Sequence, residues 1–138
     1  MTSVIWFVQL VQYPSFGRVG AEAFPAFHAH HSTRITLIVA PLMVVEALSS
    51  VALLWRPSPF VEPIEAWVGV GLVVLLWAST ALLQVPMHRR LTDGFDPSAW
   101  RFLCRSNWVR TAAWSCRALL VTRWLRRALE HVQTLTGT

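Results

Sequence analysis

The sequence predicts an all-α fold, a four-helix transmembrane bundle of up-down-up-down order that forms a single domain over residues 1–138. The chain is 54% hydrophobic, and its mean hydropathy is +0.47. Two apolar stretches, Ile35 to Trp55 and Ala66 to Leu83, are each long enough to cross about 30 Å of hydrocarbon as a helix. A soluble domain of this size would not need such uninterrupted apolar runs.

The first two helices are expected over residues 3–20 and 22–56. The first segment carries Gln9, Gln12 and Tyr13, so it becomes a membrane helix only if its polar face looks into a bundle. No basic region precedes it and polar residues interrupt its apolar run, so we interpret it as a helix rather than a cleaved signal. The second helix begins with a polar extension over residues 22–34 and continues into the first long apolar stretch.

The last two helices are expected over residues 64–89 and 97–127. Prolines between residues 57 and 63 punctuate the connection before the third helix, and Asp93-Gly94 marks the turn after it. Asp96 followed by Pro97 is typical of a helix start, with a capping side chain and proline at the first helical position. The fourth helix would measure about 45 Å, which exceeds the thickness of a bilayer core.

Tryptophans are expected to mark the two membrane interfaces, where amphipathic rings gather. With four alternating helices, one set falls at the interface shared by the two termini and a second set falls near the opposite interface. The first set is Trp6, Trp55, Trp67 and Trp124, and the second set is Trp100 and Trp108.

The charge and cysteine content restrict the partners. The formal charge of +5 comes from twelve arginines, mostly in loops and at helix ends, where arginine side chains bind lipid headgroups. We therefore expect membrane lipids as partners, no nucleic acid, and a multi-pass position in the cell membrane. Cys104 and Cys116 lack a paired-motif spacing and are interpreted as free.

Polar side chains from all four helices converge on one membrane end. Tyr13 closes the first helix and His88 closes the third, while His28 and His31 share a face near the start of the second. A polar stripe on the fourth helix begins at Asn107. The sequence therefore predicts a pocket at this end, lined by His31, His88, Asn107 and Arg110.

Three interpretations of His28, His31 and His88 stay open. The rings can face lipid headgroups, bind a divalent metal ion, or act as general acids and bases. Histidines at positions i and i+3 form a workable ligand pair, but Glu46 lies about 27 Å further along the same helix, too far to join them. The cofactor is therefore left open between none and a divalent metal at the histidine cluster.

Glu46 and Arg117 are expected to form a buried ion pair. Both lie about 10–14 Å inside the same interface when counted from Trp55 and Trp124. The pair would fix the order of the helices. A proton site or a site for a substrate anion is the alternative.

The second half of the chain resembles small four-helix membrane proteins that include the anthrone oxygenases. That family has a polar, proline-initiated segment ending the third helix and an Asn-x-x-Arg-Thr-like opening of the fourth. His88 stands where the family commonly has an asparagine. The N-terminal half, with Tyr13-Pro14, His28-x-x-His31 and Pro41-x-x-x-x-Glu46, is similar to a set of bacterial membrane proteins. The residues that carry the oxygenase resemblance are Gln84-Val85-Pro86-Met87-His88, Leu91, Gly94-Phe95, Asn107-Trp108-Val109-Arg110-Thr111, Trp114 and Arg117.

The resemblance implies a membrane oxygenase or a related oxidoreductase acting on a hydrophobic, easily ionised substrate. His88 or His31 would take a proton, and Arg110 with Asn107 would stabilise the resulting oxyanion. Substrate contacts are expected from Tyr13, Gln84 and Trp114. The second class is a non-catalytic carrier or accessory subunit that binds a metal, pigment, lipid or partner helix. Either class is compatible with a homo-oligomer.

Overall fold

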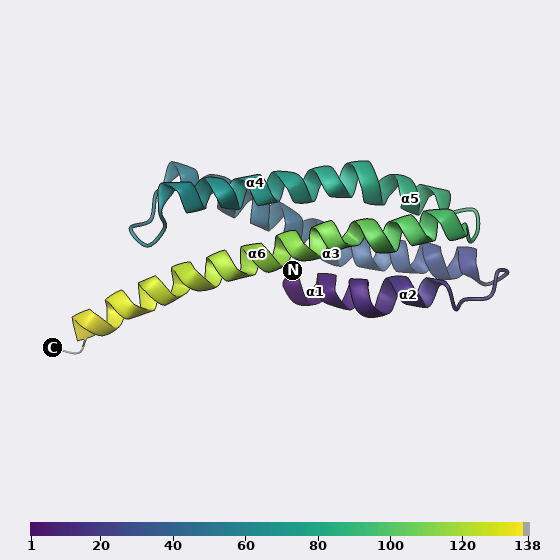
Figure 1. Ribbon diagram of the computed structural model, residues 1–138, viewed down its shortest axis with the longest axis horizontal. Coiled ribbons are helices and arrows are strands. Elements are labelled where there is room, and N and C mark those ends of the chain that lie inside the picture. The colour runs from purple at the N-terminus through teal and green to yellow at the C-terminus, as the bar shows by residue number, and fades with distance from the viewer. Residues whose placement is uncertain (137–138) are drawn as a thin grey trace.

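The computed structural model describes residues 1–136 and is an all-α four-helix bundle in up-down-up-down order, as predicted (Figure 1). The first and third helices are each divided by a π-helical turn. The four helices are α1 (Thr2–Phe7), η1 (Val8–Gln12) and α2 (Tyr13–Phe16); α3 (Phe24–Trp55); α4 (Pro63–Ser79), η2 (Thr80–Gln84) and α5 (Val85–Arg90); and α6 (Pro97–Thr136).

We call the end of the bundle that carries connections 17–23 and 91–96 the histidine end. Here the first helix stops against α6, because the Trp100 Nε1–H group donates to the Tyr13 carbonyl at 2.8 Å. A Cβ atom on Gly17 would lie 2.8 Å from the Trp100 ring, so only glycine permits this approach. The fourth helix begins at Pro97 behind Asp96, whose carboxylate accepts hydrogen bonds from the Ser98 hydroxyl and backbone. These bonds lower the pKa of Asp96.

The two π-helical turns share a physical cause. Each is followed by one residue and then a proline, Pro14 after η1 and Pro86 after η2. A proline has no N–H group, so the carbonyl four residues before it loses its α-helical partner. A π turn rearranges the hydrogen bonds at that point, and such turns are frequent at functional sites. Gln9 and Gln84 belong to these turns, and both side chains are buried.

The helix α6 organises the packing. It contacts the first helix along α1 and α2 and the third helix along α4 and α5, whereas α3 packs mainly on α4. Several apolar side chains of the hydrophobic core have no exposed surface, and they lie toward the histidine end. These fully covered side chains are Phe16, Phe24, Leu91, Ala99 and Leu103.

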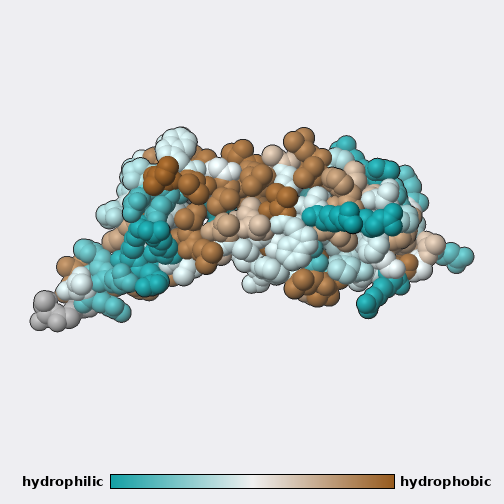
Figure 2. Space-filling model, in the orientation of Figure 1, coloured by the Kyte–Doolittle hydropathy of each residue, from teal (hydrophilic) through white to brown (hydrophobic). Residues whose placement is uncertain are grey.

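Two helices are long and apolar enough to cross a membrane, Phe24–Trp55 and Pro63–Arg90. Only 11% and 28% of their most apolar windows are buried inside the bundle, so these runs do not serve as the core of a soluble protein. Figure 2 shows apolar surface over the middle of the molecule and hydrophilic surface toward both ends. This distribution indicates association with a membrane.

The expected position of Trp6, at an interface shared by the two termini and opposite Trp108, is wrong. The Trp6 ring packs edge-to-face on Trp108 at 5.7 Å, and its Nε1–H group donates to the Ser115 hydroxyl at 3.1 Å. They therefore cannot mark opposite interfaces. The reason is the length of the first helix, which at 15 residues measures only about 22 Å and covers the half of the bundle next to the histidine end. The N-terminus consequently lies midway along the bundle (Figure 1).

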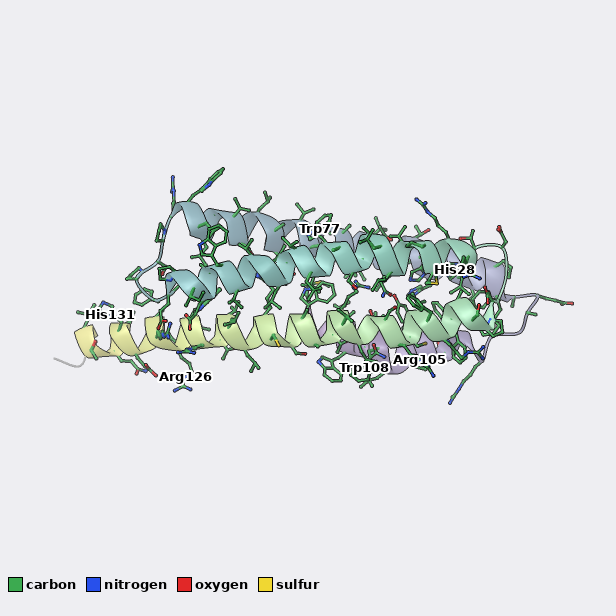
Figure 3. All side chains as sticks on the ribbon, turned by 45° about the horizontal axis from the view of Figure 1, so that its top comes forward. His28, Trp77, Arg105, Trp108, Arg126 and His131 are labelled. Carbon is green, nitrogen blue, oxygen red and sulfur yellow. The ribbon has the colours of Figure 1, made fainter. Side chains whose placement is uncertain are left out.

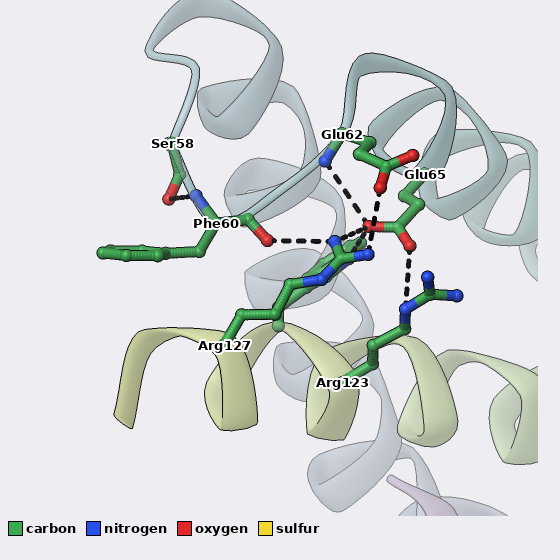
Figure 4. A network of polar contacts seen from close by, with 7 residues as sticks. Ser58, Phe60, Glu62, Glu65, Arg123 and Arg127 are labelled. Carbon is green, nitrogen blue, oxygen red and sulfur yellow. Dashed lines mark hydrogen bonds and ion pairs between the residues drawn. The ribbon is translucent and has the colours of Figure 1, made fainter. Parts of the chain in front are cut away.

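The fourth helix continues to Thr136 instead of ending near residue 127, and a charged network fastens it where it leaves the bundle (Figure 4). The buried Glu65 carboxylate pairs with Arg127 at 2.7 Å and with Arg123 at 3.2 Å. It also accepts a hydrogen bond from the Trp124 indole at 2.9 Å. The network joins the start of α4 to the C-terminal half of α6.

The up-down-up-down order predicts that the loops around residues 60 and 93 lie on opposite sides of the membrane. In a background in which Cys104 and Cys116 are replaced by serine, Phe60→Cys and Asp93→Cys should react with a membrane-impermeant maleimide from opposite sides. Labelling of intact and permeabilised cells measures this. Reaction of both positions from the same side would contradict the topology.

Candidate functional site

A cavity of about 390 Å³ lies between the first helix, α3 and the third helix, in the half of the bundle next to the histidine end. Here α3 does not pack closely against η2 and α5. Its main contacts with the third helix are with α4. Two of the cavity's lining residues are labelled in Figure 3, His28 near the histidine end and Trp77 near the middle of the bundle. Its walls are mostly apolar and include Val4, Val39 and Met43.

A chain of hydrogen bonds forms the polar end of the cavity. The Tyr13 hydroxyl lies 3.1 Å from Nε2 of His88, and Nδ1 of His88 lies 3.0 Å from Nε2 of His28. Tyr13, His28 and His88 all line the cavity. Tyr13 comes from the first helix, His28 from α3 and His88 from α5, so the chain joins three helices.

Aromatic packing holds the histidine rings in place. The Phe16 ring has no exposed surface and meets His28, His31 and His88 edge-on, with ring centroids 5.8, 5.0 and 6.4 Å away. Phe24 stacks on the other side of His28. These contacts fix the ring planes and leave the nitrogen atoms to set the direction of the hydrogen bonds.

The hydrogen-bond chain can pass a proton in either direction. If the Tyr13 hydroxyl donates to His88, the opposite nitrogen of His88 donates to His28, and reversal of both bonds gives the other state. Each neutral histidine needs one donor and one acceptor nitrogen, and both states satisfy this need for His88. When a proton is taken up at one end of the chain, a proton therefore shifts along each hydrogen bond toward the other end.

Arg110 is the one cation on the cavity wall that is buried. Its side chain is 5% exposed, and among residues 1–136 no carboxylate lies within ion-pair distance of its guanidinium. Its contacts include a hydrogen bond from Nη1 to the Asn107 side-chain oxygen at 3.3 Å, the face of the Trp114 ring at 5.0 Å and a polar interaction with the Tyr13 hydroxyl. A buried charge without a counter-charge is costly, which makes Arg110 a candidate for binding an anion.

Asn107 and Trp114 lie behind Arg110 and outside the cavity lining. The Asn107 amide donates to the Gln9 side-chain oxygen at 2.9 Å and has no exposed surface. The Trp114 indole donates to the Glu46 carboxylate at 2.7 Å. Both residues therefore position Arg110 rather than contact a ligand directly.

The structure brings Glu46 and Arg117 together. The Arg117 Nε atom lies 3.9 Å from a Glu46 carboxylate oxygen. Its two remaining nitrogens donate to the Gly69 carbonyl at 2.9 Å and to the Ser50 hydroxyl at 3.0 Å. Arg117 on α6 thus holds α3 and α4, which agrees with the role in helix order expected from the sequence.

The three histidines do not form the predicted metal site. Among residues 1–136, no three histidine, cysteine or carboxylate side chains are arranged to hold a metal ion. The facing nitrogens of His28 and His88 share a hydrogen bond, whereas metal ligands must converge on one point at about 2.0–2.1 Å. The His31 ring stacks on His88 with centroids 6.1 Å apart, but His31 lines a separate pocket of about 230 Å³.

Sequence reasoning missed the second layer of the site. Gln9 holds Asn107, Phe16 holds the histidines, and Ser106 accepts a hydrogen bond from the Gln84 amide at 3.0 Å. Helical spacing carried part of this signal, since Gln9 and Phe16 lie one turn on either side of Tyr13. Nothing in the sequence distinguished the half-buried Ser106 from the other serines.

The Glu46 and Arg117 contact predicts coupled effects on stability. Because removal of one member leaves a buried charge, Glu46→Gln and Arg117→Gln should each lower the unfolding free energy by roughly 3 kcal/mol. The double variant should recover part of the summed loss. Thermal and denaturant unfolding in detergent measure this, with Arg56→Gln as a control. Strictly additive losses would show that the two side chains are energetically independent.

Comparison of the chain with family models, with curated proteins and with solved structures finds no match.

Proposed function

We propose that this chain is a multi-pass protein of a bacterial cytoplasmic membrane whose cavity binds a hydrophobic, ionisable molecule and oxidises it. One observation carries the proposal: the buried Arg110, which has no counter-charge, lines a mostly apolar cavity beside a chain of proton-transferring groups. The low burial of α3 and of the third helix supports the membrane position. The oxygenase-like resemblance of residues 84–117 supports the reaction class.

The residues suggest a first step of proton removal. Both ring nitrogens of His88 are engaged within the protein, so a substrate proton reaches His88 through Tyr13 or His28. Tyr13 accepts the proton as its own proton passes to His88, and the electron pair released in the substrate moves onto an oxygen atom. Arg110 then stabilises the oxyanion, because its positive guanidinium attracts the new negative charge and has no carboxylate partner.

The resemblance implies molecular oxygen as the oxidant. A CH₂ group activated by a conjugated system would become a carbonyl, and the oxygen molecule would supply the new carbonyl oxygen and one molecule of water. The balance is R₂CH₂ + O₂ → R₂C=O + H₂O. The apolar wall suits both reactants, because neither the substrate nor O₂ needs polar contacts beyond the head group.

A non-catalytic carrier is the second candidate. It is favoured by the positions of Asn107 and Trp114, which lie behind Arg110 and leave few polar groups in contact with a ligand. In this function Arg110 retains the anion of a hydrophobic molecule, and the histidine chain only maintains its hydrogen bonds.

Oxygen uptake distinguishes the two functions. Purified protein in detergent should consume O₂ when anthrone is added, and His88→Gln and Tyr13→Phe should lower kcat by about 10²–10⁴-fold because the proton relay is broken. His30→Gln is the matched control, since His30 is exposed and lies outside the cavity lining. Binding of anthrone without O₂ uptake would support the carrier. Absence of both would contradict the proposed function.

A further inference from the structure

Two buried polar atoms on the cavity residues have no hydrogen-bond partner in the protein. They are the Nε–H donor of Arg110 and the Oε1 acceptor of Gln84. Buried polar groups nearly always have partners, because an unpaired group loses its hydrogen bonds to water without replacement. Arg110 lies on α6 and Gln84 on η2, and both residues line the cavity, so an unpaired donor and an unpaired acceptor belong to two of its walls.

The orientation of the Gln84 amide follows from its neighbours. Its Nε2 group donates to the Ser106 hydroxyl oxygen at 3.0 Å, and that hydroxyl donates onward to the Leu103 carbonyl at 3.4 Å. Because the Ser106 proton is already used, Ser106 can only accept from Gln84. The amide nitrogen must face Ser106, and the oxygen of Gln84 is left for another donor.

The orientation of Arg110 is fixed in the same way. The Gln9 amide donates to the Cys104 carbonyl at 3.2 Å, so its oxygen accepts from the Asn107 amide. The Asn107 oxygen is thereby turned toward Arg110 and accepts from Nη1. This bond engages Nη1, and the Nε–H group has no hydrogen-bond partner in the protein.

The shape of the cavity sets the rest of the ligand. Along α3 it is lined from His28 to Met43, and on the other side from Trp77 in α4 to Thr92, two residues beyond the end of α5. Each wall is about 22 Å long at 1.5 Å per residue. The polar groups lie toward the histidine end, whereas the deep end near Met43 and Trp77 is apolar. The cavity thus fits an elongated molecule with one polar end.

We propose that the ligand is a single-tailed amphiphile whose head carries an anionic oxygen next to a hydroxyl or N–H donor, as in a 2-hydroxy carboxylic acid. Arg110 binds the anionic oxygen and Gln84 accepts from the neighbouring donor. The apolar tail extends toward Met43 and Trp77. This inference rests on the ligand-binding part of the proposed function alone, and the amphiphile is a bound ligand distinct from the CH₂-bearing substrate of the oxidation.

The test compares three probes with the purified protein in nanodiscs: 2-hydroxydodecanoic acid, dodecanoic acid and methyl 2-hydroxydodecanoate. Equilibrium binding should rank the hydroxy acid about tenfold tighter than the plain acid, because the hydroxyl meets an unpaired acceptor. The methyl ester should bind at least a hundredfold more weakly than the hydroxy acid, because it leaves Arg110 without an anion.

Variants assign the two preferences to their residues. Gln84→Leu should abolish the tenfold preference for the hydroxyl and retain the preference for acid over ester. Arg110→Gln should abolish the acid preference alone, and Arg110→Lys, which keeps the charge, should retain part of it if the glutamine variant does not fold. Gln12→Leu, outside the cavity lining, is the control and should change neither preference.

The proposal is overturned if acid and ester bind equally, or if Gln84→Leu keeps the full preference for the hydroxyl in a folded protein. Failure of the oxidation is a separate result. A protein that ranks the three probes as expected but consumes no O₂ contradicts only the oxidative part of the proposed function.

Discussion

Polar side chains in an apolar surrounding must find their partners inside the protein, because lipid offers none. This constraint explains the central position of α6. Its inward face places polar groups at successive depths, and each takes a partner from another helix. The pairs are Asn107 with Gln9 of the first helix, Trp114 with Glu46 of α3, and Arg117 with Ser50 of α3 and Gly69 of α4. The polar side chains of α6 therefore determine which helix lies next to it at each depth.

Arg110 is the exception to this pattern. Because it lacks a carboxylate partner from another helix, we interpret it as a ligand-binding residue. Arg117, two turns along the same helix, has a carboxylate, a hydroxyl and a carbonyl as partners, whereas Arg110 has an amide oxygen, an aromatic face and the Tyr13 hydroxyl but no carboxylate. The difference arises where the backbones of α3 and the third helix diverge and leave a cavity in place of packed side chains. A protein that only needed stable packing would gain from an apolar residue at position 110.

The sequence predicted the features that depend on depth and helix end. Counting from Trp55 and Trp124 placed Glu46 and Arg117 at one depth, and the alternating order placed Tyr13, His28 and His88 at one end. Features that depend on the rotation of each helix about its own axis, or on the orientation of side-chain rings, could not be predicted. Asn107 turns toward Gln9 because the first helix lies beside it, and the histidines bond to one another because Phe16 fixes their planes. Trp6 was misplaced because hydropathy does not give the depth at which a short helix begins.

The most direct test is to identify the compound that stays bound to the protein when the protein is extracted from the membrane. Wild type and Arg110→Gln would be purified in parallel in mild detergent, extracted with organic solvent and compared by quantitative mass spectrometry. An acidic, single-tailed apolar compound should accompany the wild type in near-stoichiometric amount and be lost from the variant, while ordinary phospholipids stay equal. Identical extracts from both proteins would contradict the view that Arg110 is the anion site of a ligand cavity.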